Sequence, residues 1–260
     1  MTNMTSTKRT VLEWTYEPKG FFEEPCELPF EGGAISVADG KVRGDFDAAL
    51  YGQGSPLRDD ADEFLRSVFL AHQVQTHQSF SLTVPSMARE HSDGRRDVTV
   101  FLETLVATVS VSASLDIVHT RADGTIASDT RAERLDRHAA FRTAVAKLLP
   151  SDPALKRMLE SYNNALSDRD NLLIHLHEVR ETLSGEAGGE RAARELTGIS
   201  SSDWSRFGRL ANNDPLLEGR HRGKHVELRK ATREESDWAL EFCQRLIEGY
   251  VHSRSENISS

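Results

Sequence analysis

The spacing of apolar residues changes between two nearby stretches, VTVFLETLVATVSVSASLDIV at residues 98–118 and TRAERLDRHAAFRTAVAKLLP at residues 130–150. In the first stretch apolar and polar residues alternate, which is typical of a strand with one buried face. In the second, Phe141, Val145 and Leu148 recur at the three- and four-residue steps of a helix. We therefore expect strands before this junction and helices after it.

The chain before the junction carries further strand signals. Residues 35–42 form two short apolar runs around Asp39-Gly40, a dipeptide that favours a tight hairpin turn. Residues 80–84 alternate between apolar and polar side chains, and a second Asp-Gly dipeptide at Asp123-Gly124 follows the long strand. These patterns predict an antiparallel β structure.

Three other segments before the junction lack such patterns. Residues 50–62 are rich in Gly, Asp and Pro, and residues 90–97 are strongly charged, so both are expected to be surface loops. Residues 1–10 are polar and are expected to be loose. These first residues also lack the apolar core of a signal peptide.

After the junction the periodicity predicts helices to the end of the chain. A long helix is expected from Ser151-Asp152-Pro153 to Gly185, because apolar residues follow at three- and four-residue steps. Shorter helices are expected near residues 190–196 and 202–210. Thr232 and Glu235 have the spacing of a capping box, which predicts the start of a final amphipathic helix.

Because strands and helices are segregated along the chain, the fold class is expected to be α+β. An N-terminal antiparallel β-rich domain, residues 1–125, would be followed by a C-terminal all-helical domain, residues 126–260. The β-rich domain carries no motif that indicates its role. It could be a sensor or a platform that binds a partner protein.

Composition narrows the class of protein. The chain has 260 residues and a net charge of -9, which argues against nonspecific coating of nucleic acid. No stretch approaches the length of an apolar membrane span, so no membrane contact is expected. Cys26 and Cys243 lie far apart and form neither a disulfide framework nor a metal-ligand pair. The sequence therefore favours a cytoplasmic protein.

One short segment departs from the overall acidity. Between residues 219 and 233 the cationic residues are Arg220, Arg222, Lys224, Arg229, Lys230 and Arg233, and Glu227 is the only acid. Within it, Arg220, His221 and His225 form an arginine, a polar residue and a histidine five residues after the arginine. This pattern, just before a closing amphipathic helix, resembles the signature of the HEPN superfamily, and the resemblance extends over about residues 130–252.

The resemblance implies a helical bundle with the activity of a metal-independent endoribonuclease, which leaves cyclic phosphate ends and needs no cofactor. Many relatives are toxins or act in antiviral defence, and paired domains bring two copies of the motif together in a homodimer. His225 would be the general acid or base, because the histidine pKa lies near neutrality. Arg220 would stabilise the phosphate, with His221 orienting or sharing that task. Arg222, Lys224, Arg229 and Lys230 would bind the RNA backbone.

The predicted long helix could support this site. His175 and His177 point about 200° apart on a helix, so they cannot share a zinc ion and no metal site is expected. His177 and Glu178 remain candidates for supporting residues. Trp204 and Trp238 could stack on RNA bases, although their helical spacing favours core packing.

A second hypothesis stays open. Basic loops between helices often only cap a helix end or pair with neighbouring acids. On that interpretation the protein is a non-catalytic dimer that binds a ligand or a partner protein through its helical bundle and β-rich domain. A regulatory protein partner is compatible with either hypothesis.

Overall fold

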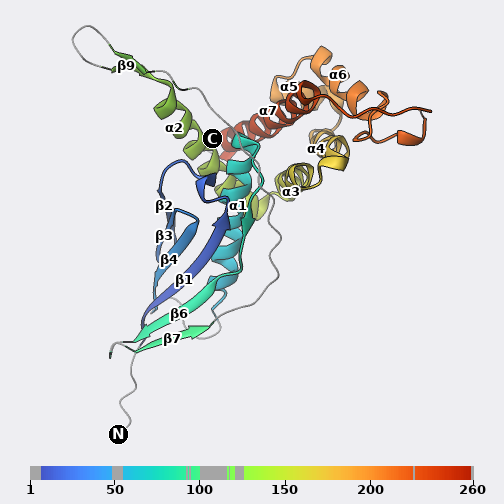
Figure 1. Cartoon of the computed structure of the whole chain (residues 1–260). Coiled ribbons are helices and arrows are strands. Elements are labelled where there is room, and N and C mark those ends of the chain that lie inside the picture. The colour runs from blue at the N-terminus through green and yellow to red at the C-terminus, as the bar shows by residue number, and fades with distance from the viewer. Residues whose placement is uncertain are drawn as a thin grey trace. The chain divides into compact units, whose positions relative to one another are not determined.

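The computed structural model describes residues 7–48, 55–91, 93, 95–99, 116, 118–120, 126–224 and 226–258. The chain divides into two compact units, residues 1–66 with 80–110 and residues 67–79 with 111–260. An antiparallel sheet forms most of the first unit and helices form most of the second (Figure 1). This segregation confirms the α+β class.

The sheet of the first unit is antiparallel throughout. Its strand order is β2 (Cys26–Phe30), β3 (Gly33–Ala38), β4 (Lys41–Asp47), β1 (Thr7–Glu17), β6 (Ser86–His91) and β7 (Arg96–Thr99), and β5 (Ser81–Leu82) also pairs with β1. A short 3-10 helix, η1 (Lys19–Phe21), follows β1. On the central strand β1, Leu12, Trp14 and Tyr16 are buried on one face, as the two-residue period of a strand requires.

The predicted hairpin around Asp39-Gly40 is confirmed. Ala38 pairs with Lys41 across the turn, and Asp39 and Gly40 both have positive φ angles, 50° and 78°. Positive φ angles at both central residues are typical of a type I′ turn, whose twist matches that of the paired strands. The expectation of a loose N-terminus is wrong from Thr7 onward, because β1 begins there and pairs with a neighbour on each side.

The predicted loop at residues 50–62 is wrong over its second part, where α1 (Leu57–Thr76) begins. Asp59 and Asp60 lie in the first turn, where carboxylates interact favourably with the helix dipole. Leu57, Ala61 and Leu65 follow at four-residue steps and are buried. The acidic first turn resembled a polar loop because the helical spacing becomes apparent only further along the chain.

The predicted long strand at residues 98–118 lies mostly outside the described residues. Its start coincides with the end of β7, and Val118 begins the short strand β8 (Val118–Thr120), which pairs with β9 (Ile126–Asp129). The predicted turn at Asp123-Gly124 also lies outside the described residues. The charged loop expected at residues 90–97 is shorter than predicted, since β6 ends at His91 and β7 begins at Arg96.

The helical unit contains α2 (Thr130–Leu148), α3 (Pro153–Ser167), α4 (Leu172–Ala187), α5 (Glu190–Thr197), α6 (Ser201–Asn212) and α7 (Arg233–Ile258). Short 3-10 helices, η2 (Leu149–Ser151), η3 (Arg169–Asn171) and η4 (Arg222–Lys224), connect some of them. The capping box that starts α7 is confirmed. Glu235 N–H donates to Thr232 Oγ1 at 3.2 Å, and Thr232 N–H donates to Glu235 Oε2 at 2.8 Å.

The single long helix expected from residue 151 to 185 is wrong. It is interrupted at Asp168, whose backbone leaves the helical conformation between α3 and η3. Asn171 donates to Asp168 through both its backbone N–H, at 3.1 Å, and its side-chain amide, at 2.7 Å. Short polar side chains of this kind compete with helical hydrogen bonds. The break starts α4 in a new direction (Figure 1).

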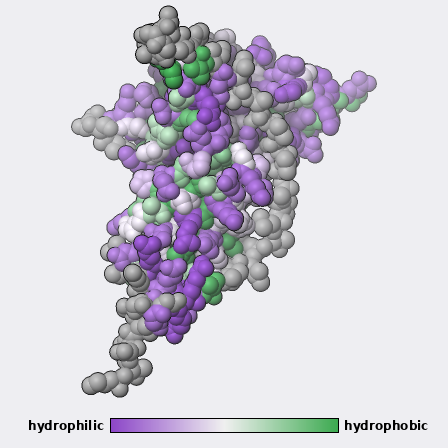
Figure 2. Space-filling view, turned by 60° about the vertical axis from the view of Figure 1, so that its left-hand side comes forward, coloured by the Kyte–Doolittle hydropathy of each residue, from purple (hydrophilic) through white to green (hydrophobic). Residues whose placement is uncertain are grey.

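The core of the helical unit forms around α7, which contacts each of α2 to α6. Its fully buried residues include Phe242, Cys243, Leu246 and Ile247. Hydrophilic residues cover most of the described surface on the face shown in Figure 2. Within the described ranges, no helix is both long and apolar enough to cross a membrane.

Candidate functional site

The segment between α6 and α7 carries the Arg220 motif and is fixed to the helical unit by backbone hydrogen bonds. Arg220 N–H donates to the carbonyl of Ala211, in α6, at 2.9 Å. Leu216 and Arg229 form an isolated β-bridge across the segment, in which Leu217 N–H donates to the Arg229 carbonyl and Arg229 N–H to the Pro215 carbonyl, both at 2.9 Å. Leu216 is buried at the start of this segment. The motif is therefore held at a defined place beside α6.

The Arg220 side chain is directed to α4. Its Nη1 donates to His177 Nδ1 at 2.9 Å and to Glu181 Oε1 at 3.2 Å. His177 and Glu181 are four residues apart and therefore lie on the same face of α4. The interactions place a guanidinium, an imidazole and a carboxylate at one point on the helical unit.

His177 is buried, with 2% of its surface exposed. Burial, with smaller contributions from the nearby Arg180 and Arg220 guanidinium groups, lowers its pKa to about 4. Its ring lies over Phe207, with 6.4 Å between ring centroids and 24° between planes. At neutral pH His177 is therefore an uncharged ring held in one orientation.

The tautomer of His177 follows from its partners. Arg220 Nη1 lies 2.9 Å from Nδ1 and 3.3 Å from Nε2, and the shorter contact assigns the accepting lone pair to Nδ1 and the ring proton to Nε2. The Asn212 amide lies at this atom, with Nδ2 at 2.9 Å, while its Oδ1 is buried and has no partner among the described residues. Turning the amide by 180° pairs Oδ1 with the ring N–H and satisfies both groups. Both ring nitrogens of His177 are then occupied.

A column of stacked rings holds His177 in place. Phe207 of α6 stacks on Phe242 of α7 at 4.6 Å and 13°, and Phe242 stacks on Trp238 at 5.5 Å and 25°. Arg206 covers the outer face of Trp238, with its guanidinium carbon 3.9 Å from the ring centroid. These rings join three helices behind the His177–Arg220 pair.

Arg180 contributes a second cation close to this pair. Its guanidinium lies 5.1 Å from the Trp204 ring centroid and 5.9 Å from that of Phe207. Gly208 makes room for it, since a Cβ at that position would lie 2.8 Å from Arg180 Nη1. Two arginines therefore lie around one uncharged histidine, an arrangement suited to a negatively charged ligand.

Arg222, expected to bind RNA, instead holds the motif segment to the start of α4. Its Nη2 donates to the Asp170 carbonyl at 2.8 Å and to Asn171 Oδ1 at 2.6 Å, and its Nε donates to the Gly219 carbonyl at 3.1 Å. Arg229, also expected to bind RNA, pairs with Glu235 of the capping box through two bonds of 2.7 Å. These contacts give both arginines a structural role in the free chain.

The remaining predicted residues are placed as follows. His221, Lys224 and Lys230 are exposed on the motif segment. His225, the predicted general acid or base, lies outside the described residues. Glu178, a predicted supporting residue, contacts Ser161 and His175 and has no bond to Arg220.

The sequence named His177 as a candidate supporting residue, and the structure brings it to Arg220; Glu181 and Asn212, which also lie there, were not among the candidates. Glu181 had a usable signal, because it follows His177 by four residues on a helix. Asn212 had none, since it comes from α6, 35 positions along the chain. No group of three or more His, Cys, Asp or Glu side chains that could hold a metal ion occurs within the part of the chain that is described.

A second histidine with a lowered pKa lies elsewhere in the helical unit, where it is partly buried. His77 follows α1 in a left-handed conformation, with φ of 54°, and its Nδ1 bonds to the Tyr162 hydroxyl. Burial lowers its pKa to about 4, with a smaller contribution from Arg169 in the same direction, while Asp237 opposes the shift. His77 and His177 are thus both uncharged at neutral pH.

We expect the stability of the helical unit to fall as the pH is lowered from about 6.5 to about 4. In this window the unfolded chain, with histidine pKa values near 6.5, binds more protons than the folded chain, so acid favours unfolding. Urea unfolding at pH 7 and pH 5, followed by helical circular dichroism, measures the difference. His77→Asn, which keeps a residue tolerant of the left-handed conformation, should reduce it.

The matched control is His252→Asn, because the His252 side chain is 77% exposed. It should leave the pH dependence unchanged. An equal fall in stability for the wild-type chain and His77→Asn would contradict the assignment of this acid sensitivity to His77.

Comparisons of the chain with protein-family models, with curated proteins and with solved structures find no match.

Proposed function

We propose that the helical unit is a HEPN-like bundle with metal-independent endoribonuclease activity, centred on Arg220 and acting as a homodimer. The observation that supports this most is the state of the Arg220 guanidinium. Its side chain is 35% exposed, and its bonds to described residues all use Nη1. Nε and Nη2 therefore remain as a pair of donors held in a fixed orientation, which suits two oxygens of one phosphate.

The proposed chemistry needs such a group. When the ribose 2′-hydroxyl attacks the adjacent phosphorus, negative charge builds on the phosphate oxygens, and donors already in position stabilise it. His177 and Glu181 hold Arg220, so little reorganisation is needed as the charge develops. The uncharged His177 adds no second positive charge that would repel the guanidinium.

His177 is unsuited to proton transfer in this scheme. Both of its ring nitrogens are occupied, and a pKa of about 4 leaves it almost without protons to donate at neutral pH. The general acid and base are instead assigned to His225, with His221 assisting on the exposed motif segment. In a homodimer the same groups from two copies of the motif would act on one phosphate.

RNA binding would rest on the exposed cations of the segment. Lys224 and Lys230 have side chains without a hydrogen-bond or ion-pair partner among the described residues, so both can pair with phosphates. Arg222 and Arg229 would contribute by maintaining the shape of the segment, through α4 and the capping box.

A specific contact favours the second candidate, a non-catalytic dimer that binds a ligand or protein. Glu181 lies 3.2 Å from the Arg220 guanidinium and neutralises part of its charge. In a nuclease the incoming phosphate would compete with this carboxylate. In a binding protein the pair would only fasten the segment to α4.

The deciding experiment is cleavage of a mixed RNA pool by the full chain in EDTA, beside His225→Ala and His221→Ala. We expect cleavage that survives the chelator, leaves cyclic phosphate ends, and falls by about 10²–10⁴-fold in His225→Ala, because general acid–base catalysis contributes that much. His221→Ala should be affected less. His252→Ala, an exposed histidine elsewhere on the chain, controls for contamination and should retain full activity.

Absence of cleavage, or equal cleavage by all four proteins, would favour the non-catalytic candidate. In that case the oligomeric state and partner binding of the same proteins become the relevant measurements.

A further inference from the structure

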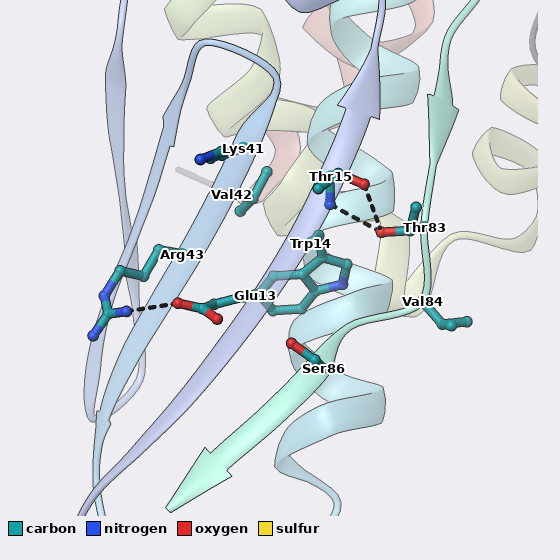
Figure 3. Close-up of a pocket in the computed structure, with 9 residues that line it drawn as sticks. All are labelled: Glu13, Trp14, Thr15, Lys41, Val42, Arg43, Thr83, Val84 and Ser86. Atoms are coloured by element: carbon teal, nitrogen blue, oxygen red, sulfur yellow. Dashed lines mark hydrogen bonds and ion pairs between the residues drawn. The ribbon is translucent and has the colours of Figure 1, made fainter. Parts of the chain in front are cut away.

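The sheet unit contains a hollow of about 430 Å³ on strand β1 and its neighbours. It is lined by residues of β1 and β4 and of the β5–β6 segment: Glu13, Trp14, Thr15, Lys41, Val42, Arg43, Thr83, Val84 and Ser86 (Figure 3). Its volume falls within the range of roughly 300–1,000 Å³ typical of small-ligand pockets. All residues that line the hollow belong to the sheet unit, whereas Arg220 belongs to the helical unit.

The hollow forms where the partner of β1 is interrupted. Thr83 N–H donates to the Thr15 carbonyl at 3.0 Å, but Thr15 N–H donates to the Thr83 hydroxyl at 2.9 Å instead of to a carbonyl. Pro85, which has no N–H, then separates β5 from β6, and regular pairing resumes only at Glu13 and Ser86. The Thr83 side chain thus replaces a backbone carbonyl as the acceptor from Thr15 N–H, and the regular pairing of β1 is interrupted between β5 and β6.

This replacement leaves a donor available. The Thr83 Oγ1 accepts from Thr15 N–H and also from the Thr15 hydroxyl at 3.4 Å (Figure 3). A threonine hydroxyl can donate while it accepts, so the Thr83 hydroxyl can accept from Thr15 N–H and donate its own proton to a group in the hollow.

Two further donors line the same hollow. Lys41 is exposed, and its ammonium has no partner among the described residues. The Ser86 hydroxyl likewise has no hydrogen bond within the described chain. The donors available in the hollow are therefore the Lys41 ammonium, which carries a positive charge, and the hydroxyls of Thr83 and Ser86.

The one carboxylate in the hollow is already neutralised. Glu13 accepts from Arg43 at 2.8 Å and lies 3.5 Å from Arg96, which is on the neighbouring strand β7. The lining therefore has one positive charge more than negative, in a chain whose net charge is -9. A small anion can enter such a hollow.

We propose that this hollow is a binding site for a small organic anion whose phosphate or carboxylate group is held by Lys41 and the Thr83 and Ser86 hydroxyls. The organic part would contact Val84 and the backbone of β1 and β4 at Trp14 and Val42, whose side chains are buried on the other face of the sheet. The site gives the sheet unit a ligand-sensing role that does not depend on activity at Arg220.

The test follows the Trp14 indole in the ¹H–¹⁵N spectrum of the full ¹⁵N-labelled chain. Trp14 lines the hollow and donates its indole N–H to Asp62 at 2.9 Å, whereas Trp204 and Trp238 belong to the other unit. Trp14→Phe assigns the signal. The probes are inorganic phosphate, adenosine monophosphate and succinate, each titrated to millimolar concentration.

We expect at least one probe to shift the Trp14 signal in a saturable way while the signals of the other two tryptophans stay in place. A response to the first two probes alone identifies a phosphate site, and a response to succinate identifies a carboxylate site. No saturable shift with any probe would overturn the proposal.

Variants locate the binding group. Lys41→Met should weaken the binding probe by about tenfold or more, because a hydrogen bond to a charged group is lost. Ser86→Ala removes a hydroxyl that makes no hydrogen bond to the described part of the sheet, unlike that of Thr83, so it tests binding of the anion without disturbing strand pairing. Arg9→Met is the matched control, since Arg9 lies on β1 of the same sheet, pairs with Asp45 and does not line the hollow. Equal weakening by Arg9→Met would show nonspecific attraction and reject the site.

Discussion

Arg220→Ala is expected to reduce RNA cleavage by about 10²–10³-fold, the loss typical of removing one donor that stabilises transition-state charge. The change removes Nε and Nη2, the free donors that would meet the phosphate. It also removes the bond to His177 Nδ1 at 2.9 Å. Single-turnover cleavage of a defined RNA, with saturating protein, measures the loss in the chemical step.

Arg220→Lys separates charge from geometry. Lysine keeps the positive charge but has a single ammonium in place of the planar fork, so at least a tenfold loss is expected to remain. Arg191→Ala is the control, because Arg191 is 86% exposed on α5 and its loss changes the net charge equally. Cleavage by Arg220→Ala at the wild-type rate would exclude Arg220 from the mechanism.

The second large effect concerns stability. Phe242→Ala should lower the free energy of unfolding of the helical unit by about 3–5 kcal/mol, the usual cost of truncating a buried phenylalanine. Phe242 has no exposed surface and stacks between Phe207 and Trp238, with Trp204 at 6.2 Å. Urea unfolding followed by circular dichroism measures the change.

Phe242→Leu is the informative comparison. It keeps an apolar side chain but removes the ring between Phe207 and Trp238, so its cost should be clearly smaller than that of alanine. Because the ring column holds His177, Phe242→Leu should also reduce cleavage at temperatures where the unit remains folded. A loss of stability below about 1 kcal/mol in Phe242→Ala would contradict a close-packed column.

Features set by neighbouring residues could be predicted from the sequence. The turn at Asp39-Gly40, the capping box of Thr232 and Glu235, and the start of α2 at Thr130 follow from local chemistry. The start of α1 and the break at Asp168 were missed, although their signals are also local. In both, short polar side chains were attributed to the wrong element, because the same residues favour loops, caps and first turns.

The sequence by itself determined the change from a mainly β to an all-helical chain near residue 130, the two turn and cap motifs, and the position of the basic segment before α7, but not the helix α1 that lies between β4 and β5. Only the tertiary structure decided which side chains surround Arg220. His177 and Asn212 lie 43 and 35 positions from their partners, and burial of the His177 ring sets its charge. Spacing along one helix assigns a residue to a face, but the partner on that face depends on how separate helices pack. The hollow beside Thr83 likewise depends on the tertiary structure, since the Thr83 hydroxyl is positioned by a hydrogen bond from Thr15 N–H, 68 residues away.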